Sequence, residues 1–307
     1  MNKVIALVFL FLAVISCRVQ RDMEKDEGKV KVLSTIAQIG DIVSQIGGDR
    51  VSSGVLVQRE LNPHTYELVK GDGEKIASAE VIFYNGLGLE HGASVCAMLA
   101  SHKNVLAVGE QINSSALLQK EGQTDPHIWM DISLWSEIVD PIAVKLSEID
   151  PDGKIFYQQR AELIKKKMVE VHGEIFRELQ AVSSEKRYLV TSHDAFHYFT
   201  RAYLAEPLEI LWDHRFAAPE GLAPDGQLNP VDLQKIIDHL RLYNIHVVFP
   251  ESNVSRDSIR KIASAAHQLG MQVRICREPL YGDAMQGTYL EAMEHNARII
   301  AKHLEER

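Results

Sequence analysis

Three histidines and one aspartate stand in settings that suit metal coordination. The histidines lie in Asn62-Pro63-His64, Asp125-Pro126-His127 and Thr191-Ser192-His193, and the aspartate lies in Tyr281-Gly282-Asp283. Imidazole and carboxylate together bind first-row divalent cations. Because these residues are about 60 to 90 positions apart, no single loop can hold them, and only a folded body could bring them together. Taken singly, each of the 13 histidines is better explained as a structural residue.

The neighbours of the histidines change that interpretation. Proline in both Pro-His segments biases its predecessor toward extended backbone and fixes the turn. We therefore expect each histidine just past a strand, at the edge where an open α/β sheet binds ligands. We expect His193 and Asp283 each to follow a strand in the same way. Asp125 or Asp131 could accept the free ring N–H of His127, a contact that metal-bound imidazole usually makes.

The segments that must position these residues alternate between short apolar runs and helical patterns. Nearly continuous apolar runs predict parallel strands buried on both faces, and the alternation predicts an α/β fold. In the first half we expect strands at 30–34, 54–57, 81–84 and 105–108, and helices at 36–46, 66–79 and 91–102.

The second half repeats this order of elements. Asn229 and Pro230 predict a helix start, and Gly270 predicts a helix end. We expect strands at 188–191, 208–211, 247–249 and 273–276, and helices at 230–243, 255–269 and 288–307.

A long amphipathic segment, residues 153–183, lies between the halves and contains no proline. At 1.5 Å per residue, one helix of this length would span about 45 Å and could run along both lobes. A helix broken near Gly173 is the alternative. The apolar stripe recurs at steps of three and four, through Met168, Val171, Ile175, Leu179 and Val182.

The start of the chain predicts export. An apolar run from Val4 to Ile15 is too short to cross a bilayer and suits a signal peptide, residues 1–16. It ends at Ser16-Cys17, which resembles a lipoprotein cleavage box and predicts acylation of Cys17, followed by a charged tether over 17–28. The alternative is an ordinary secretory signal with an incidental cysteine. We expect a membrane-anchored protein on the periplasmic or extracellular face.

Composition narrows the remaining classes of function. A net charge of −9 offers no basic patch for nucleic acid. Cys96 and Cys276 lie in predicted elements of different halves, so we expect two buried thiols rather than a disulfide. We also expect a monomer.

Six segments, in order along the chain, carry a resemblance to a known family. Asn-Pro-His-Thr-Tyr-Glu, Asp-Pro-His-Ile-Trp-Met-Asp, Thr-Ser-His-Asp-Ala-Phe and Asp-Ala-Met, with the segments 84–90 and 249–252, are similar to those of the TroA/ZnuA-like solute-binding proteins. These proteins deliver zinc or manganese to ABC importers. The resemblance covers roughly residues 29–305 and implies partnership with an ABC permease and its ATPase.

The same resemblance implies an architecture and a ligand set. It implies an N-terminal lobe over 29–151, a linker helix over 152–185 and a C-terminal lobe over 186–307, with the metal in the cleft between the lobes. Two ligands would come from each lobe. The implied ligands are His64, His127, His193 and Asp283.

The chain departs from the family in three places. Residues 113–124 contain no histidine, unlike the histidine-rich loop of the zinc branch, and residues 213–229 do not match the segment expected there. His197 stands four residues after His193, and we favour His193 as the ligand, with His197 beside the site or on the surface. Nitrogen ligands argue against Mg²⁺ and Ca²⁺ but leave Mn²⁺, Zn²⁺ and Fe²⁺ open.

A zinc-dependent hydrolase is the rival interpretation, because three histidines and a water also form catalytic zinc sites. It would need a general base, for which Glu251 could be proposed, although a structural loop acid explains that residue better. No His-Glu-x-x-His, Gly-x-Ser-x-Gly or phosphate-binding loop occurs. We therefore predict a carrier and not an enzyme, with a surface adhesin-like role only as an addition. A stiff linker helix predicts small lobe movements.

Overall fold

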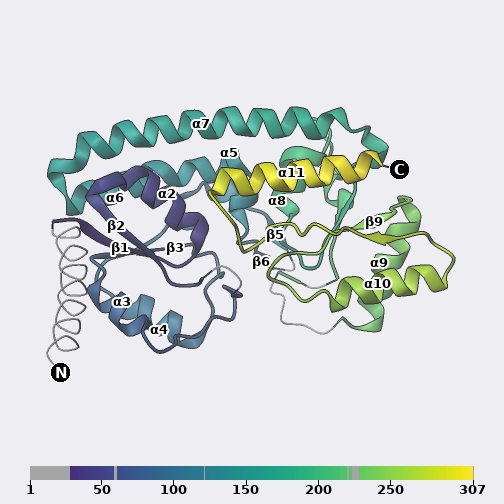
Figure 1. Cartoon of the computed structure of the whole chain (residues 1–307), viewed down its shortest axis with the longest axis horizontal. Helices are drawn as coiled ribbons and strands as arrows, with labels where there is room; N and C mark the ends of the chain where they lie inside the picture. Colours follow the sequence, from purple (N-terminus) through teal and green to yellow (C-terminus); the bar gives the residue numbers. More distant parts are fainter. Residues whose placement is uncertain (1–27, 59–60, 121, 220, 223–227, 307) are drawn as a thin grey trace, which may run out of the picture.

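The computed structural model describes residues 28–58, 61–120, 122–219, 221–222 and 228–306. Two α/β lobes lie side by side along one long helix, α7 (Figure 1). This confirms the expected fold class: parallel strands with flanking helices in each lobe, joined by a backbone helix. The predicted signal peptide, Cys17 and nearly all of the predicted tether lie outside the described residues. In the part of the chain that is described, no helix has the length and apolarity needed to cross a membrane.

The N-terminal lobe is built on a four-stranded parallel sheet of order β2-β1-β3-β4. Its strands are β1 (Val30–Ser34), β2 (Val51–Val55), β3 (Val81–Tyr84) and β4 (Val105–Ala107). Its helices are α2 (Ala37–Gly47), α3 (Asp72–Ser78), α4 (Ala93–Ser101), α5 (Ile132–Trp135) and α6 (Val139–Ile149). A two-stranded antiparallel hairpin, β5 (Gln119–Lys120) and β6 (Gln123–Thr124), follows the sheet.

Two predictions in this lobe were wrong in extent. β2 begins three residues before the predicted strand because Val51 pairs with Val30 at the start of β1. The helix predicted over 66–79 forms only from Asp72. The carboxylate of Asp72 accepts the Tyr66 hydroxyl at 2.7 Å and the Val69 N–H at 3.0 Å, so residues 66–71 form a loop that closes on the helix start.

The C-terminal lobe has shorter strands, paired in two parallel sets. β7 (Leu189–Val190) pairs with β8 (Phe216–Ala217), and β9 (Val247–Val248) pairs with β10 (Arg274–Ile275). The Phe249 N–H donates to the Val190 carbonyl at 2.8 Å and links the two sets. The helices are α8 (His197–Phe199), α9 (Pro230–Leu242), α10 (Asp257–Gln268) and α11 (Tyr289–Glu305). Asn229 caps α9 as predicted, accepting two backbone N–H groups.

The strand predicted over 208–211 is wrong. Pro207 and Leu208 are the central residues of a turn closed by the Glu209 N–H donating to the Glu206 carbonyl at 3.0 Å. Leu208 has φ +65° and is 99% exposed, so its apolar side chain does not pack. Glu206 pairs with Arg187, and Glu209 accepts from Arg215 at 2.6 Å. These ion pairs hold the turn, and the parallel partner of β7 comes from Phe216–Ala217 instead.

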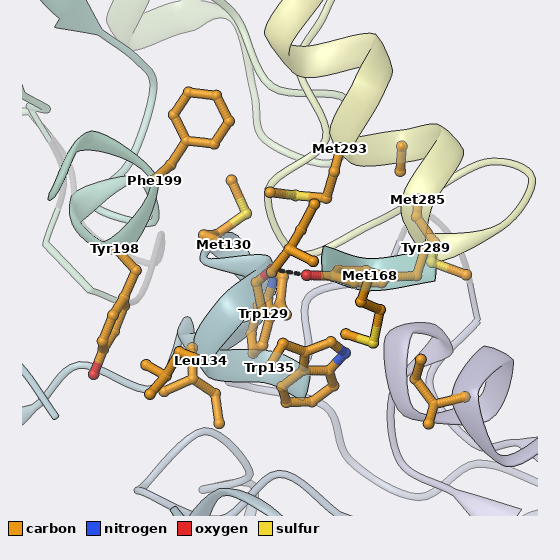
Figure 2. Close-up of a cluster of buried hydrophobic side chains, with 14 of the residues drawn as sticks. Trp129, Met130, Leu134, Trp135, Met168, Tyr198, Phe199, Met285, Tyr289 and Met293 are labelled. Atoms are coloured by element: carbon orange, nitrogen blue, oxygen red, sulfur yellow. Dashed lines mark hydrogen bonds between the residues drawn. The ribbon is translucent and has the colours of Figure 1, made fainter. Parts of the chain in front are cut away.

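The long helix α7 runs unbroken from Lys154 to Ala181, through Gly173. The five residues of its predicted apolar stripe are all buried. Figure 2 shows the core beneath it, where Met168 of α7 lies among side chains of both lobes, including Trp129 and Tyr289. The Tyr289 hydroxyl donates to the Trp129 carbonyl at 2.5 Å. A single hydrophobic core therefore continues from one lobe to the other.

The cysteine prediction is half right. Cys276 is buried, but Cys96 is exposed on α4, and both are free thiols. Val95 and Met98 face the core from the other side of α4, which leaves Cys96 turned toward solvent.

Candidate metal centre

The structure brings His64, His127, His193 and Asp283 together in one cluster. Each residue offers one ligand atom, and these atoms all lie within 4.8 Å of one another. The four residues are at most 5% exposed. Two histidines come from the N-terminal lobe, and the third histidine and the aspartate come from the C-terminal part of the chain.

The spacing of the ligand atoms suits a tetrahedral cation. His127 Nε2 lies 3.3 Å from His64 Nε2 and 3.4 Å from Asp283 Oδ1. Asp283 Oδ2 lies 3.4 Å from His193 Nε2 and 3.7 Å from His64 Nε2. Ligands at about 2.1 Å from a tetrahedral zinc ion are separated by about 3.4 Å. Both carboxylate oxygens of Asp283 are buried without a hydrogen-bond donor, which a cation would satisfy.

The two Pro-His turns have the same local construction. The Asn62 side-chain oxygen accepts the His64 N–H at 2.9 Å, and the Asp125 carboxylate accepts the His127 N–H at 3.0 Å. Both are turns in which a side chain two residues upstream replaces a backbone acceptor. The proline between them removes a competing donor and restricts the backbone. Each imidazole is therefore aimed by its own tripeptide.

Two histidines have an acid at the second ring nitrogen. His127 Nδ1 lies 2.7 Å from Asp125 Oδ1, so Asp125 rather than Asp131 takes the predicted role. His193 Nδ1 lies 2.7 Å from Glu251 Oε2, and the other oxygen of Glu251 accepts the His193 N–H at 2.9 Å. Such contacts orient imidazoles toward a metal.

Glu251 is thus a site residue that sequence reasoning left as a structural acid. Its position directly after Phe249-Pro250, beyond the end of β9, was the available signal. β9 lies beside β7, the strand that precedes His193, so the two strand ends meet.

The surroundings of Asp283 differ from the prediction. Asp283 does not directly follow the last strand: β10 ends at Ile275, and Leu280 then forms a parallel bridge with Glu251. The Asp283 carbonyl accepts Gln38 Nε2 of α2 at 2.8 Å, and the Gly282 carbonyl accepts Trp129 Nε1 at 3.0 Å. The N-terminal lobe therefore holds the loop that carries Asp283.

Gly282 is required by close packing. A Cβ atom at this position would lie 2.3 Å from Glu251 Oε2 and 3.4 Å from His193 Cε1. Sequence reasoning missed Gln38, Trp129 and Gly282, because their roles depend on contacts with residues more than 30 positions away.

The four groups have strongly altered protonation. Burial, with the neighbouring imidazoles, outweighs the opposing charge of Asp283 and lowers the pKa of His64 to about 3. Burial also disfavours charge on His127, but Asp125 and Asp283 outweigh it and raise the pKa to about 9. For His193, the charges of Glu251 and Asp283 likewise overcome burial and raise the pKa. The pKa of Asp283 is lowered because His193 and the other imidazoles overcome the effect of burial.

His197 lies beside the cluster. Its side chain is buried, with Nε2 2.8 Å from Asp194 Oδ1 and 2.8 Å from Lys120 Nζ. A cavity of about 910 Å³ lies in front of the centre, and its wall includes His64, His91, Lys120 and Asp194. The centre therefore faces solvent on the side of Lys120.

Two α/β lobes with a buried cluster of three imidazoles and one carboxylate between them define a two-lobe metal-binding protein. The chain belongs to the ZnuA family, described as zinc-uptake complex component A, periplasmic, which matches residues 32–303.

Relatives in this family are named for different metals. The Fe(III)-bound structure of YtgA from Chlamydia trachomatis is 37% identical, with a TM-score of 0.86, over 90% of this chain and 98% of that one. The periplasmic zinc-binding protein TroA from Treponema pallidum is 30% identical, with a TM-score of 0.83, over 90% and 99%. The manganese-binding lipoprotein MntA of Bacillus subtilis is 32% identical over 97% of both chains.

Proposed function

We propose that this protein captures a transition-metal cation outside the cytoplasm and delivers it to an ABC importer. His64, His127, His193 and Asp283 are the proposed ligands, held between lobes at 29–151 and 186–307 with the linker helix over 152–185. The observation that carries this proposal is the buried cluster of four ligand atoms within 4.8 Å. The cation is the cargo, and its release requires the two lobes to separate at the cluster.

The proposed cargo is Mn²⁺, Zn²⁺ or iron. Three neutral imidazoles and one carboxylate give a divalent ion a net site charge of about +1 and supply nitrogen ligands that Mg²⁺ and Ca²⁺ disfavour. The three relatives named above are described with iron, zinc and manganese. Family membership therefore does not select one metal, and the choice depends on geometry and on supply.

The protein is proposed to be a carrier and not an enzyme. Metal-dependent hydrolysis needs a free general base beside the metal. Asp125 and Glu251 each lie 2.7 Å from a histidine ring nitrogen, so both carboxylates are engaged in orienting ligands. Two further buried acids near the centre are engaged as well: Glu90 accepts hydrogen bonds from Thr35 and two backbone N–H groups, and Asp194 pairs with Lys120 and His197.

The proposed setting is the outer side of a membrane. Cys17 is the proposed lipid anchor, and residues 18–28 the proposed tether, on the periplasmic or extracellular face. The proposed partners are an ABC permease and its ATPase, and the carrier is expected to be a monomer. The relative MntA is described as a lipoprotein, which supports the anchor.

Metal analysis of natively purified protein tests the proposal. We expect one transition-metal ion per chain. In a second measurement, in which Zn²⁺, Mn²⁺ and Fe²⁺ compete for the protein, we expect one of them to be retained selectively. A parallel peptidase and phosphatase screen should show no turnover that chelation abolishes. Absence of stoichiometric metal, or chelator-sensitive turnover, would contradict the carrier.

A further inference from the structure

The hairpin β5–β6 of the N-terminal lobe lies on the C-terminal lobe. The Leu118 N–H donates to the Tyr198 hydroxyl at 2.9 Å, and that hydroxyl donates to the Asp125 carbonyl at 3.0 Å. Arg201 donates to the Ala116 carbonyl at 3.1 Å. The segment that leads into the Asp125-Pro126-His127 turn is thus held by the opposite lobe.

Lys120 on this hairpin reaches a charged cluster beside the metal centre. Lys120 Nζ lies 3.0 Å from Asp194 Oδ2, and His197 Nε2 lies 2.8 Å from Asp194 Oδ1. One imidazole nitrogen cannot accept from the ammonium and donate to the carboxylate at once. The carboxylate of Asp194 is therefore the common acceptor for the ammonium and for the imidazole N–H.

Asp194 is covalently joined to His193, so a force on its side chain reaches a proposed ligand. The Thr191 hydroxyl donates to the His193 carbonyl at 2.8 Å, which makes residues 191–194 a compact unit. The Asp194 side chain is only 7% exposed, whereas that of Lys120 is 39% exposed. The cluster therefore has a buried anchor on one lobe and a partly exposed cation on the other.

The opposite side of the centre is joined differently. There, Gln38 and Trp129 of the N-terminal lobe hold the loop of Asp283 through buried hydrogen bonds. Lobe separation on that side would leave buried polar groups without partners, which is costly. Separation on the Lys120 side breaks the partly exposed Lys120–Asp194 ion pair together with the hydrogen bonds that Tyr198 and Arg201 make to the hairpin segment. Among the contacts on the Lys120 side, the Lys120–Asp194 pair is the one joined directly to a proposed ligand, because Asp194 follows His193 in the chain.

We propose that Lys120 is a latch between the lobes: by binding Asp194 it holds His193 against the metal and slows release of the cation. This proposal rests on the proposed function. Lys120 is a positioning residue: it acts on the cation through Asp194 and His193 and does not touch the cation itself. Residues 113–124 contain no histidine that could collect metal. In this proposal the hairpin within them slows metal release instead.

The test is the rate of zinc release from the full chain. Zinc-loaded wild type, Lys120→Met, Lys120→Arg and Lys165→Met are mixed with excess chelator and followed by absorbance of the zinc–chelator complex. Lys165 is a matched control, because it pairs with Asp140 at 2.9 Å and Glu162 at 2.7 Å without crossing the cleft. We expect release from Lys120→Met to be about two- to fivefold faster, as for loss of a partly exposed ion pair. Lys120→Arg and Lys165→Met should remain near wild type.

Salt separates a latch from a general structural effect. Raising ionic strength should speed release from wild type and leave Lys120→Met unchanged, because only wild type has the ion pair to screen. Equal unfolding temperatures of the metal-free proteins would show that the variant is folded. If Lys120→Met released zinc at the wild-type rate, or if Lys165→Met were accelerated as much as Lys120→Met, the latch alone would be overturned. Wild type that takes up none of Zn²⁺, Mn²⁺ and Fe²⁺ would overturn the proposed function and the latch together.

Discussion

The two Pro-His turns are built alike and differ in one chemical group. Both use a side-chain oxygen two residues upstream to accept the histidine N–H, at 2.9 Å from Asn62 and at 3.0 Å from Asp125. Asp125 also reaches the ring of His127 at 2.7 Å, and its charge, together with that of Asp283, overcomes burial and raises the pKa of that ring to about 9. His64, which follows an amide, has a pKa of about 3, chiefly through burial.

This difference gives the two imidazoles different states before metal arrives. At neutral pH the His64 ring is a neutral imidazole, whereas the His127 ring carries a second proton and a positive charge. A metal ion can bind His64 directly but must displace the proton from His127. His64 also lines the cavity in front of the centre, so we infer that it is the first ligand met by an incoming cation.

Removing either ring should have the largest effect. At a thousandfold excess over the dissociation constant, metal adds about 4 kcal/mol to stability, and hundredfold weaker binding leaves about 1.4 kcal/mol. We expect His64→Ala and His127→Ala each to lose at least that hundredfold in affinity. Unfolding temperature with and without Mn²⁺ and Zn²⁺ measures this. If each metal raised the unfolding temperature of His127→Ala as much as it raises that of wild type, the site would be wrongly assigned.

Acid should weaken binding through His127 rather than His64. Below its pKa of about 9 the His127 ring carries a proton, so affinity should fall about tenfold per pH unit for each proton displaced as pH is lowered from 9 to 7. The His193 ring, whose pKa is also raised, adds to this slope. Titration of metal at pH 7, 8 and 9 measures it. A flat profile would contradict the protonated state of both rings.

The stability of the metal-free protein should depend on the same ring. Its folded pKa is raised above the unfolded value of 6.5, so its contribution to stability is fully present below pH 6.5 and is lost as pH rises through about 9. The unfolding temperature of metal-free protein should fall across this window, unless metal is added. His127→Ala should reduce this fall and leave the part due to His193, whose pKa is also raised, which makes the variant the internal control.

Asp125→Asn makes the second turn resemble the first. The amide oxygen can still accept the His127 N–H, but the charge is gone, so the pKa of His127 should fall. We expect about ten- to hundredfold weaker metal binding at pH 9, a range typical for loss of such a contact, and a smaller loss at pH 7, where one proton fewer must be displaced. Calorimetry in two buffers with different ionisation enthalpies counts that proton. Unchanged proton release would contradict the role assigned to Asp125.

How much of this could be predicted from the sequence depends on how local each cause is. The two turns are complete within three residues, so the side chain, the proline and the histidine are adjacent in the chain. The capping of α9 by Asn229 and the burial of the α7 stripe are local in the same sense. These features could be predicted from neighbouring residues. The two-lobe architecture and the clustering of the four site residues are not local, and the ligand set was predicted from the resemblance of six ordered segments to a known family.

What was missed depends on distant partners. Gln38 holds Asp283 from 245 residues away, and no pattern around Gln38 marks that contact. The apolar run at 208–211 resembles a strand, but Arg187 and Arg215 hold the turn that displaces it. Hydrophobicity alone predicts burial, whereas the ion pairs formed on folding decide where this segment lies.

Asn62→Asp makes the first turn resemble the second and should have the smallest effect on affinity. A carboxylate at this position keeps the acceptor for the His64 N–H and adds a negative charge near the ring, so the pKa of His64 should rise from about 3. The added charge attracts the cation, while any added proton competes with it. We therefore expect a change of threefold or less at pH 7, measured by metal titration.

Proton counting gives the sharper result for this variant. If an upstream carboxylate is enough to make a Pro-His turn hold a proton, Asn62→Asp should release more protons on metal binding than wild type at pH 6, in the same two-buffer calorimetry. Asn62→Ala, which removes the acceptor without adding charge, is the matched control and should release no more than wild type. Equal release from all three would show that ring contact, which Asp125 makes at 2.7 Å, is needed as well as charge. The difference between the turns would then depend on the orientation of the acid rather than on its presence.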